Sequence, residues 1–236
     1  MLFDIRGRRR RFIQAIYVFL ALLLGGGLVL FGIGGDAQGG LGAIFGLDQN
    51  SGGTGNPDYD NQIESAQERL EVDPTDQAAL LQLARFQFLA GNDATETDDQ
   101  GRVAFTEEAE DRFQQATDAW ERYLATDPRS PDDSAASLIF QAYSRLASTS
   151  ELPDPQVLEG AQKTAAIIAE ERPSVNSFLQ LAAYSYFSGE VKAGDAAAEK
   201  AIAEAGDDVD EDALKSLKSQ LKQIKQTGKA LQAQID

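Results

Sequence analysis

Apolar residues recur at three- and four-residue intervals through most of the chain after residue 58. Such spacing places them on one face of an α-helix, whereas the strict alternation that is typical of strands is scarce. Three of these runs end at a proline, namely Pro74, Pro128 and Pro173. Proline cannot continue a helix and disfavours helical backbone in the residue before it. The pattern therefore predicts an all-α body of successive helices, each closed in a similar way.

Two helical runs match almost position for position. LLQLARFQFLAGN begins at Leu80 and FLQLAAYSYFSGE begins at Phe178, and both place a Leu-Ala pair and a later glycine at the same offsets. This pattern resembles the first helix of the tetratricopeptide repeat (TPR) family, whose 34-residue unit continues with a second helix and a terminal proline. The resemblance covers residues 59–206. It implies about three helical hairpins stacked as a solenoid, after a lone half-repeat helix over 59–72.

The three units depart from the repeat pattern in different ways. The first carries Ala116, Trp120 and Pro128 at the expected positions of its second helix, but an insertion near residues 93–111 separates its halves. In the second unit Phe140 replaces the usual small residue. The third has glycine at the usual alanine and proline positions, Gly194 and Gly206.

Residues 207–236 form a separate pattern. Apolar residues keep helical spacing at Leu214, Leu217, Leu221, Ile224, Leu231 and Ile235, with Gly228 interrupting them. This stripe needs a partner, and a helix that caps the exposed face of the last repeat would supply one. A coiled-coil or partner-binding helix is the alternative. A second, basic strip follows the same spacing and could remain solvated or pair with an acidic surface: Lys215, Lys218, Lys222, Lys225 and Lys229.

The N-terminal part of the chain is different in character. Residues 12–33 contain no charge and would span about 33 Å as a helix, close to the thickness of a bilayer core. We therefore expect a single transmembrane helix there, because the apolar run of a cleaved signal peptide is shorter. In the basic segment 1–11, the cluster Arg8, Arg9, Arg10 and Arg11 places the N-terminus in the cytoplasm. Residues 34–58 are rich in glycine and are expected to be a flexible linker.

Charge and composition exclude several functions. The net charge is −17, and residues 1–35 account for +4 of it, which leaves −21 for the rest of the chain. So acidic a body repels phosphate backbones, and nucleic acid is not an expected partner. Cysteine and histidine are absent, which excludes disulfides, thiolate or imidazole catalysis and zinc sites built on those residues.

No motif for catalysis or cofactor binding appears in the chain. Phosphate loops, dinucleotide fingerprints and nucleophile elbows are absent, and the acidic clusters lack the alternating spacing of a calcium loop. We expect no enzyme activity, no cofactor and no metal. Solvated loops and helix caps account for the carboxylates.

The resemblance to the TPR family implies a peptide-binding groove lined by the first helix of each hairpin. The family's groove positions correspond here to Leu81, Arg85, Phe88, Leu89, Ser137, Gln141, Ser144, Arg145, Asn176, Leu179, Ala183, Tyr186 and Phe187. Apolar anchors with two arginines suit a peptide that carries hydrophobic side chains and a carboxylate. Alternatively, Phe88, Leu89 and Phe187 are core residues between helices.

These expectations combine into one functional hypothesis. The chain is expected to be an inner-membrane protein of bacterial type, with its helical domain on the extracytoplasmic side, that binds a membrane-associated protein or peptide and assists secretion or envelope protein folding. Its layout is similar to that of the membrane-anchored TPR subunits that accompany the bacterial Sec translocon. Two alternatives stay open: a self-associating assembly factor of an envelope complex, as a homo-oligomer, and a factor that holds apoproteins during cytochrome c maturation.

Overall fold

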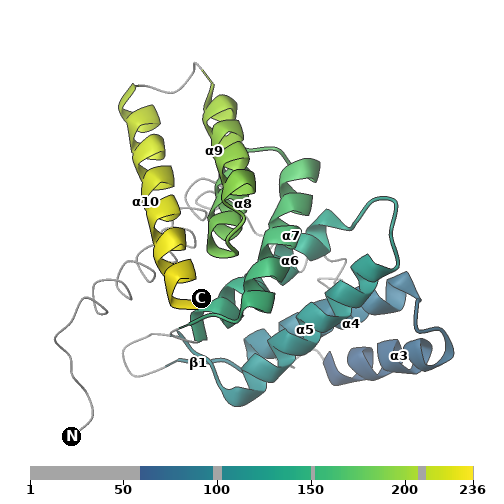
Figure 1. Cartoon of the computed structure of the whole chain (residues 1–236). Helices are drawn as coiled ribbons and strands as arrows, with labels where there is room; N and C mark the ends of the chain where they lie inside the picture. The colour runs from purple at the N-terminus through teal and green to yellow at the C-terminus, as the bar shows by residue number, and fades with distance from the viewer. Residues whose placement is uncertain (1–58, 98–102, 150–151, 207–210, 236) are drawn as a thin grey trace, which may run out of the picture. The chain divides into compact units, whose positions relative to one another are not determined.

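The computed structural model describes residues 59–97, 103–149, 152–206 and 211–235. The chain divides into two units, Met1–Pro57 and Asp58–Asp236, and all of these residues belong to the second. In the described part, eight helices and one short pair of strands follow one another (Figure 1). They are α3 (Tyr59–Val72), α4 (Gln77–Asp93), β1 (Glu96–Thr97), β2 (Val103–Ala104), α5 (Glu107–Ala125), α6 (Asp133–Thr149), α7 (Pro155–Glu171), α8 (Val175–Phe187), α9 (Val191–Ala205) and α10 (Glu211–Ile235).

Side-chain caps explain where several helices begin. The side chains of Asp76, Thr106 and Asp154 each accept a hydrogen bond from a backbone N–H in the first turn of α4, α5 and α7. Pro155 occupies the first turn of α7, where the missing N–H costs nothing. Ser174 forms a reciprocal capping box with Ser177 at the start of α8. Short polar segments after each proline therefore restart the chain as a helix.

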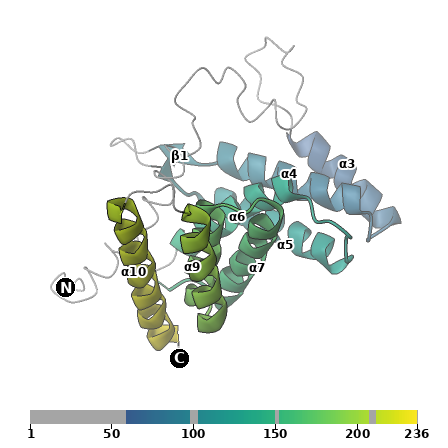
Figure 2. The ribbon, with the colours of Figure 1, turned by 90° about the horizontal axis from the view of Figure 1, so that it is seen from above.

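The helices pair as antiparallel hairpins that stack in series. α4 packs on α5, α6 on α7 and α8 on α9, and each hairpin rests on the next through α5 against α6 and α7 against α8. α3 covers α4 at one end of the series, and α10 packs on α8 and α9 at the other (Figures 1 and 2). The result is a run of hairpins in which contacts are made almost entirely between neighbours.

Small residues let these helices approach closely, and aromatic residues fill the space between hairpins. Ala84, Ala116 and Ala182 have no exposed surface. Trp120 and Tyr184 are among the largest fully buried side chains. The Trp120 indole N–H donates to Thr164 Oγ1 at 3.1 Å, which joins α5 of the first hairpin to α7 of the second. The core is therefore continuous from one hairpin to the next.

The predicted fold class, an all-α domain with one transmembrane helix, needs a correction for that helix. Over the described ranges, no helix combines the length and the apolar character that a membrane crossing requires. The expected transmembrane segment, 12–33, lies outside these ranges, as do the basic segment 1–11 and the linker 34–58. The fold described here is helical and contains no membrane span.

The insertion in the first unit is shorter than expected and contains strands. α4 continues to Asp93 and α5 already begins at Glu107, so only the intervening residues leave the helical pattern. β1 and β2 pair antiparallel with Glu96 opposite Ala104. Two-residue strands are too short to show an alternating pattern in the sequence, which is why none was predicted.

The departures from the repeat pattern have local packing reasons. The Phe140 ring meets the Tyr184 ring edge to face at 5.1 Å, so the larger side chain fills the space between α6 and α8. A Cβ atom at Gly194 would lie 2.6 Å from the Tyr186 ring. Gly206 follows α9 with φ of 66°, a backbone conformation that favours glycine. Phe140 and Gly194 are thus matched to the tyrosines that they face, and Gly206 to its backbone conformation.

Alkaline pH is expected to destabilise this core through Tyr184. Burial raises the pKa of Tyr184 to about 12. Its hydroxyl donates a hydrogen bond to Ser144 Oγ. The folded state keeps this proton, whereas the unfolded state loses it above about pH 10. The contribution of Tyr184 to the free energy of unfolding is therefore fully present below pH 10. It falls between pH 10 and pH 12 by up to ~1.4 kcal/mol per pH unit. Urea unfolding from pH 9 to 12 should show a shallower loss in Tyr184→Phe; equal slopes would contradict the assignment.

Candidate protein-binding surface

The first helices of the three hairpins, α4, α6 and α8, are linked to one another by side chains. We call the side of the domain formed by these three helices the first-helix surface. The Arg85 guanidinium donates to Asp132, just before α6, at 2.6 Å, and the Asp132 carboxylate also accepts from the Ala135 N–H at 2.7 Å. The Tyr184 hydroxyl donates to Ser144 Oγ at 2.9 Å, which joins α8 to α6. These contacts fix the positions of α4, α6 and α8 relative to one another.

Arg145 occupies the junction between α4 and α6. Its guanidinium carbon lies 5.5 Å from the centre of the Phe88 ring and 5.1 Å from that of Phe113, within the range of a cation–π interaction. One guanidinium N–H donates to Asn92 Oδ1. These contacts draw on α4, α5 and α6 together, so the position of the guanidinium is set by the packing of two hairpins.

The electrostatic setting of Arg145 differs from that of the other arginines described above. Burial lowers the pKa of Arg145, since its charge is partly removed from water. Over the described ranges no carboxylate forms an ion pair with it, whereas Arg85 pairs with Asp132 and Arg112 with Asp60. A half-buried guanidinium that lacks a counter-ion favours binding of an external carboxylate.

The structure divides the predicted groove residues into two groups. Half-buried side chains that retain contact with solvent are Leu81, Arg85, Leu89, Ser137, Gln141, Ser144, Arg145 and Asn176. Buried side chains are Phe88, Leu179, Ala183, Tyr186 and Phe187. The second group packs between helices. The alternative interpretation took Phe88, Leu89 and Phe187 as core residues; Phe88 and Phe187 are buried, whereas Leu89 is only half-buried. Only the first group can meet a partner directly.

Tyr186 serves the contact between α8, α9 and α10. It is 3 % exposed, and its hydroxyl donates to Asp195 Oδ1 on α9 at 2.7 Å. The Lys225 ammonium on α10 binds the same carboxylate at 2.5 Å and lies 5.7 Å from the Tyr186 ring centre. Burial, followed by the hydrogen bond to Asp195, raises the pKa of Tyr186. This residue therefore holds the last helix in place.

Sequence reasoning missed the residues that position the surface arginines. Asn92, Phe113 and Asp132 lie outside the groove positions of the repeat pattern, yet they contact Arg145 or Arg85. Asp132 had a readable signal, because an acidic residue just before a helical run is a typical N-cap. Asn92 and Phe113 had none, since their contact with Arg145 depends on how two hairpins pack together.

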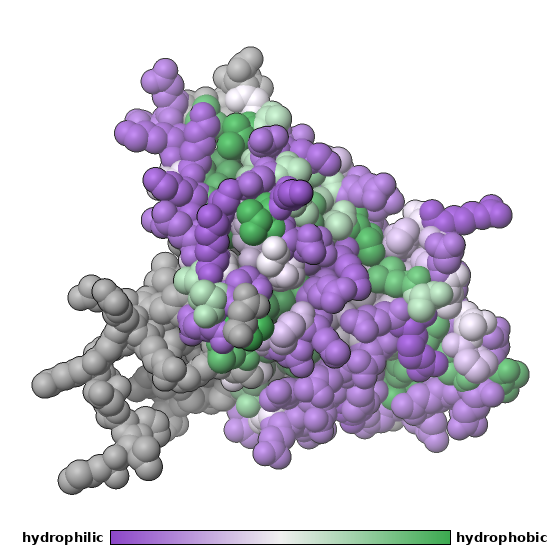
Figure 3. Space-filling model, in the orientation of Figure 1, coloured by the Kyte–Doolittle hydropathy of each residue, from purple (hydrophilic) through white to green (hydrophobic). Residues whose placement is uncertain are grey.

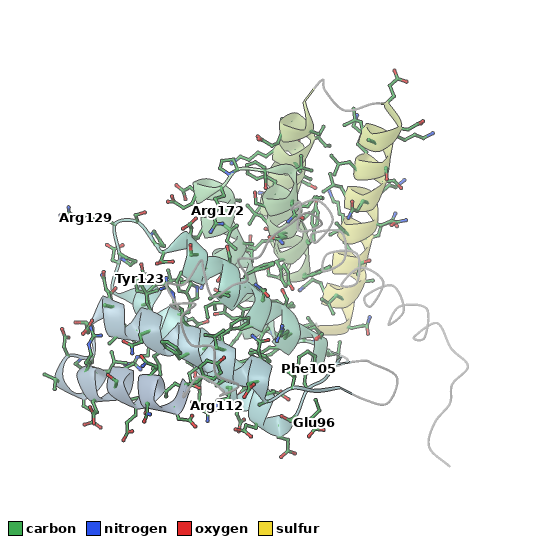
Figure 4. The ribbon with its side chains drawn as sticks, turned by 180° about the vertical axis from the view of Figure 1, so that it is seen from behind. Glu96, Phe105, Arg112, Tyr123, Arg129 and Arg172 are labelled. Atoms are coloured by element: carbon green, nitrogen blue, oxygen red, sulfur yellow. The ribbon has the colours of Figure 1, made fainter. Side chains whose placement is uncertain are left out.

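Other arginines fasten the hairpins at their edges. Figure 4 labels Arg112 on α5 and Arg172 at the end of α7. Arg112 binds Asp60 of α3 at 3.1 Å, and the Arg172 guanidinium donates to Asp133 of α6.

Polar side chains cover most of the face seen in Figure 3, with hydrophobic patches between them. Over the described ranges, no group of three acidic residues is placed to hold a metal ion.

Comparisons with known proteins give no family for this chain. No protein-family model, curated protein or solved structure matches it.

Proposed function

We propose that this chain is a TPR-type helical scaffold that binds a protein or peptide partner on its first-helix surface, without a catalytic step. The observation that carries the proposal is Arg145, a guanidinium that is fixed by two hairpins and has no carboxylate partner in the described ranges. Leu81, Leu89 and Gln141 keep some exposure on the same helices and would supply apolar and amide contacts beside it. A peptide with one carboxylate and hydrophobic side chains suits this combination.

The expected location of the domain and of its partner at a membrane stays a prediction. It depends on residues 1–58, which lie outside the residues that the structure describes.

Site-specific photo-crosslinking tests the proposal. A photoreactive residue is placed at Leu89 or Gln141, which are half-buried, and at Lys163, which is exposed on α7 and is the control. Phe88 is unsuitable, being 2 % exposed. We expect the same protein to be crosslinked from Leu89 and Gln141 but not from Lys163, as identified by mass spectrometry of the adducts.

A pair of Arg145 variants makes the crosslinking result specific. Arg145→Gln is expected to reduce adducts from Gln141 at least about tenfold, because one charged hydrogen-bonded contact is worth roughly 1.5–3 kcal/mol and about 1.4 kcal/mol is a factor of ten. Arg145→Lys keeps the charge but not the planar fork and should retain part of the yield. Equal yields from the wild type and both variants would exclude Arg145 from partner binding. Adducts from Lys163 alone would place the partner elsewhere.

A further inference from the structure

α10 carries a row of exposed positive charge. We define the lysine stripe as Lys215, Lys218, Lys222 and Lys229. At 3.6 residues per turn they lie within about 60° of one another around the helix and extend over roughly 21 Å. None of the four has an ion-pair partner over the described ranges, in contrast to Lys225, which lies beside them and is bound to Asp195. From Ala213 to Ile235 the helix contains no acidic residue.

α3 carries the complementary row. We define the acidic stripe as Asp60, Glu64, Glu68 and Glu71, all of which are exposed. They lie within about 80° of one another and extend over roughly 16 Å, so this row fits within the length of the lysine stripe. Only Asp60 has an ion-pair partner in the described part, Arg112 at 3.1 Å. Each stripe therefore has four charges of one sign at intervals of three to seven residues.

The spacing of the like charges in each stripe destabilises the helix that carries them. Like charges three or four residues apart on a helix repel each other, and each stripe contains at least two such neighbouring pairs. A surface of opposite charge would relieve this repulsion. The buried residues of α3 and α10, such as Ile63 and Leu221, lie on other sides of these helices. The lysine stripe and the three acidic residues after Asp60 are therefore exposed to another molecule.

The two stripes lie at opposite ends of the hairpin series. α3 contacts chiefly α4, and α10 contacts α8 and α9 (Figures 1 and 2). Within the described ranges, the two stripes of one copy therefore do not meet each other, whereas the stripes of two copies can. We propose that the lysine stripe on α10 of one copy docks on the acidic stripe of α3 in a second copy.

The shape of the charge favours a second copy over other anionic partners. The lysine stripe is one side chain wide, and the helix beside it, α9, carries Asp195, Glu199 and Glu204. A broad anionic surface would meet those carboxylates as well, whereas a single helix with one acidic row would not. The net charge of −17 makes two copies repel each other at a distance. At physiological salt, charges more than about 8 Å apart are largely screened, so the attraction between stripes in contact exceeds this repulsion.

Because the docking faces differ, the contact joins unlike surfaces. It either repeats from copy to copy or closes when two copies exchange both contacts at once. This inference does not depend on the first-helix surface, because neither stripe includes a residue from α4, α6 or α8.

Sedimentation velocity of the full chain in a non-ionic detergent, at 150 mM NaCl (low salt) and 500 mM NaCl (high salt), tests the contact. We expect concentration-dependent association at low salt, where the repulsion between the acidic bodies is already screened, that weakens at least tenfold at high salt. The variant Lys218→Glu/Lys222→Glu and the variant Glu64→Lys/Glu68→Lys should each remain monomeric. Mixed in equal amounts, the two variants should associate again, because each then presents the charge that the other lacks.

A matched control separates this contact from a change in net charge. Glu170→Lys/Glu171→Lys alters the charge by the same amount as the α3 variant but lies on α7, and it should associate as the wild type does. Circular dichroism checks that every variant is folded. A wild type that is monomeric at low salt, or association that all variants share, would overturn the proposal. So would a mixture of the two stripe variants that stays monomeric.

Discussion

Replacing Trp120 by alanine is expected to lower the free energy of unfolding by about 3–5 kcal/mol, the range observed for large aromatic residues in a core. Trp120 has no exposed surface, stacks on Tyr123 with ring centres 5.2 Å apart, and donates its indole N–H to Thr164. Because Thr164 belongs to the next hairpin, the substitution opens a cavity between two repeats rather than within one. Urea unfolding followed by circular dichroism measures the loss.

The control for this prediction is Trp120→Phe. Phenylalanine keeps most of the ring contact but cannot donate to Thr164, so we expect a loss of only about 1–2 kcal/mol. The Thr164 hydroxyl still donates to the Gly160 carbonyl in this variant, so it is not left unpaired. If Trp120→Ala and Trp120→Phe were equally stable, the indole would not fill the space between the hairpins.

Replacing Gly228 by valine is expected to detach α10 from α8. A Cβ atom at Gly228 would lie 2.6 Å from the Tyr186 carbonyl oxygen and 2.7 Å from the Tyr186 Cβ, so the helix must move. Overpacking of this kind costs about 1–3 kcal/mol. The hydrogen bond that the Gln232 side chain donates to the Phe187 carbonyl is lost with the movement. Thermal unfolding and limited proteolysis of α10 report the two effects.

Ala230→Val is the matched control for Gly228. Ala230 is exposed on the same helix, two residues away, so the same side chain should there cost only the lower helix propensity of valine, up to about 0.7 kcal/mol. Even Gly228→Ala should destabilise, although alanine in place of glycine normally stabilises a helix by about 1 kcal/mol. A stabilised Gly228→Ala variant would contradict the close approach of α10 to Tyr186.

Gly228 shows how far the sequence could predict the structure. The apolar spacing predicted a helix over this region, and the glycine stood out only as an interruption of that pattern. Its reason is a contact with Tyr186, which is more than forty residues earlier in the chain. Helical periodicity indicates which face of a helix is buried, but not which residues that face contacts. It therefore cannot predict long-range contacts of this kind.

The same limit applies to the candidate surface. Repeat spacing identified the helices that line it and both of its arginines, because position along a helix fixes which side a residue occupies. It did not separate buried Tyr186 and Leu179 from half-buried Gln141, since that depends on how hairpins and the last helix pack together. Asn92 and Phe113, the partners of Arg145, belong to the preceding hairpin, and spacing along the chain does not report contacts between hairpins.

The serial arrangement of hairpins also determines how a local change is transmitted. In the described part of the chain, each hairpin makes its main contacts with the hairpin or helix before and after it, so the array behaves as a one-dimensional chain of coupled units. A perturbation at α3 can reach α10 only through every interface between them, and each interface can open separately. The domain is therefore expected to unravel from its two ends inward, with the Trp120 contact between the first and second hairpins among the last to separate.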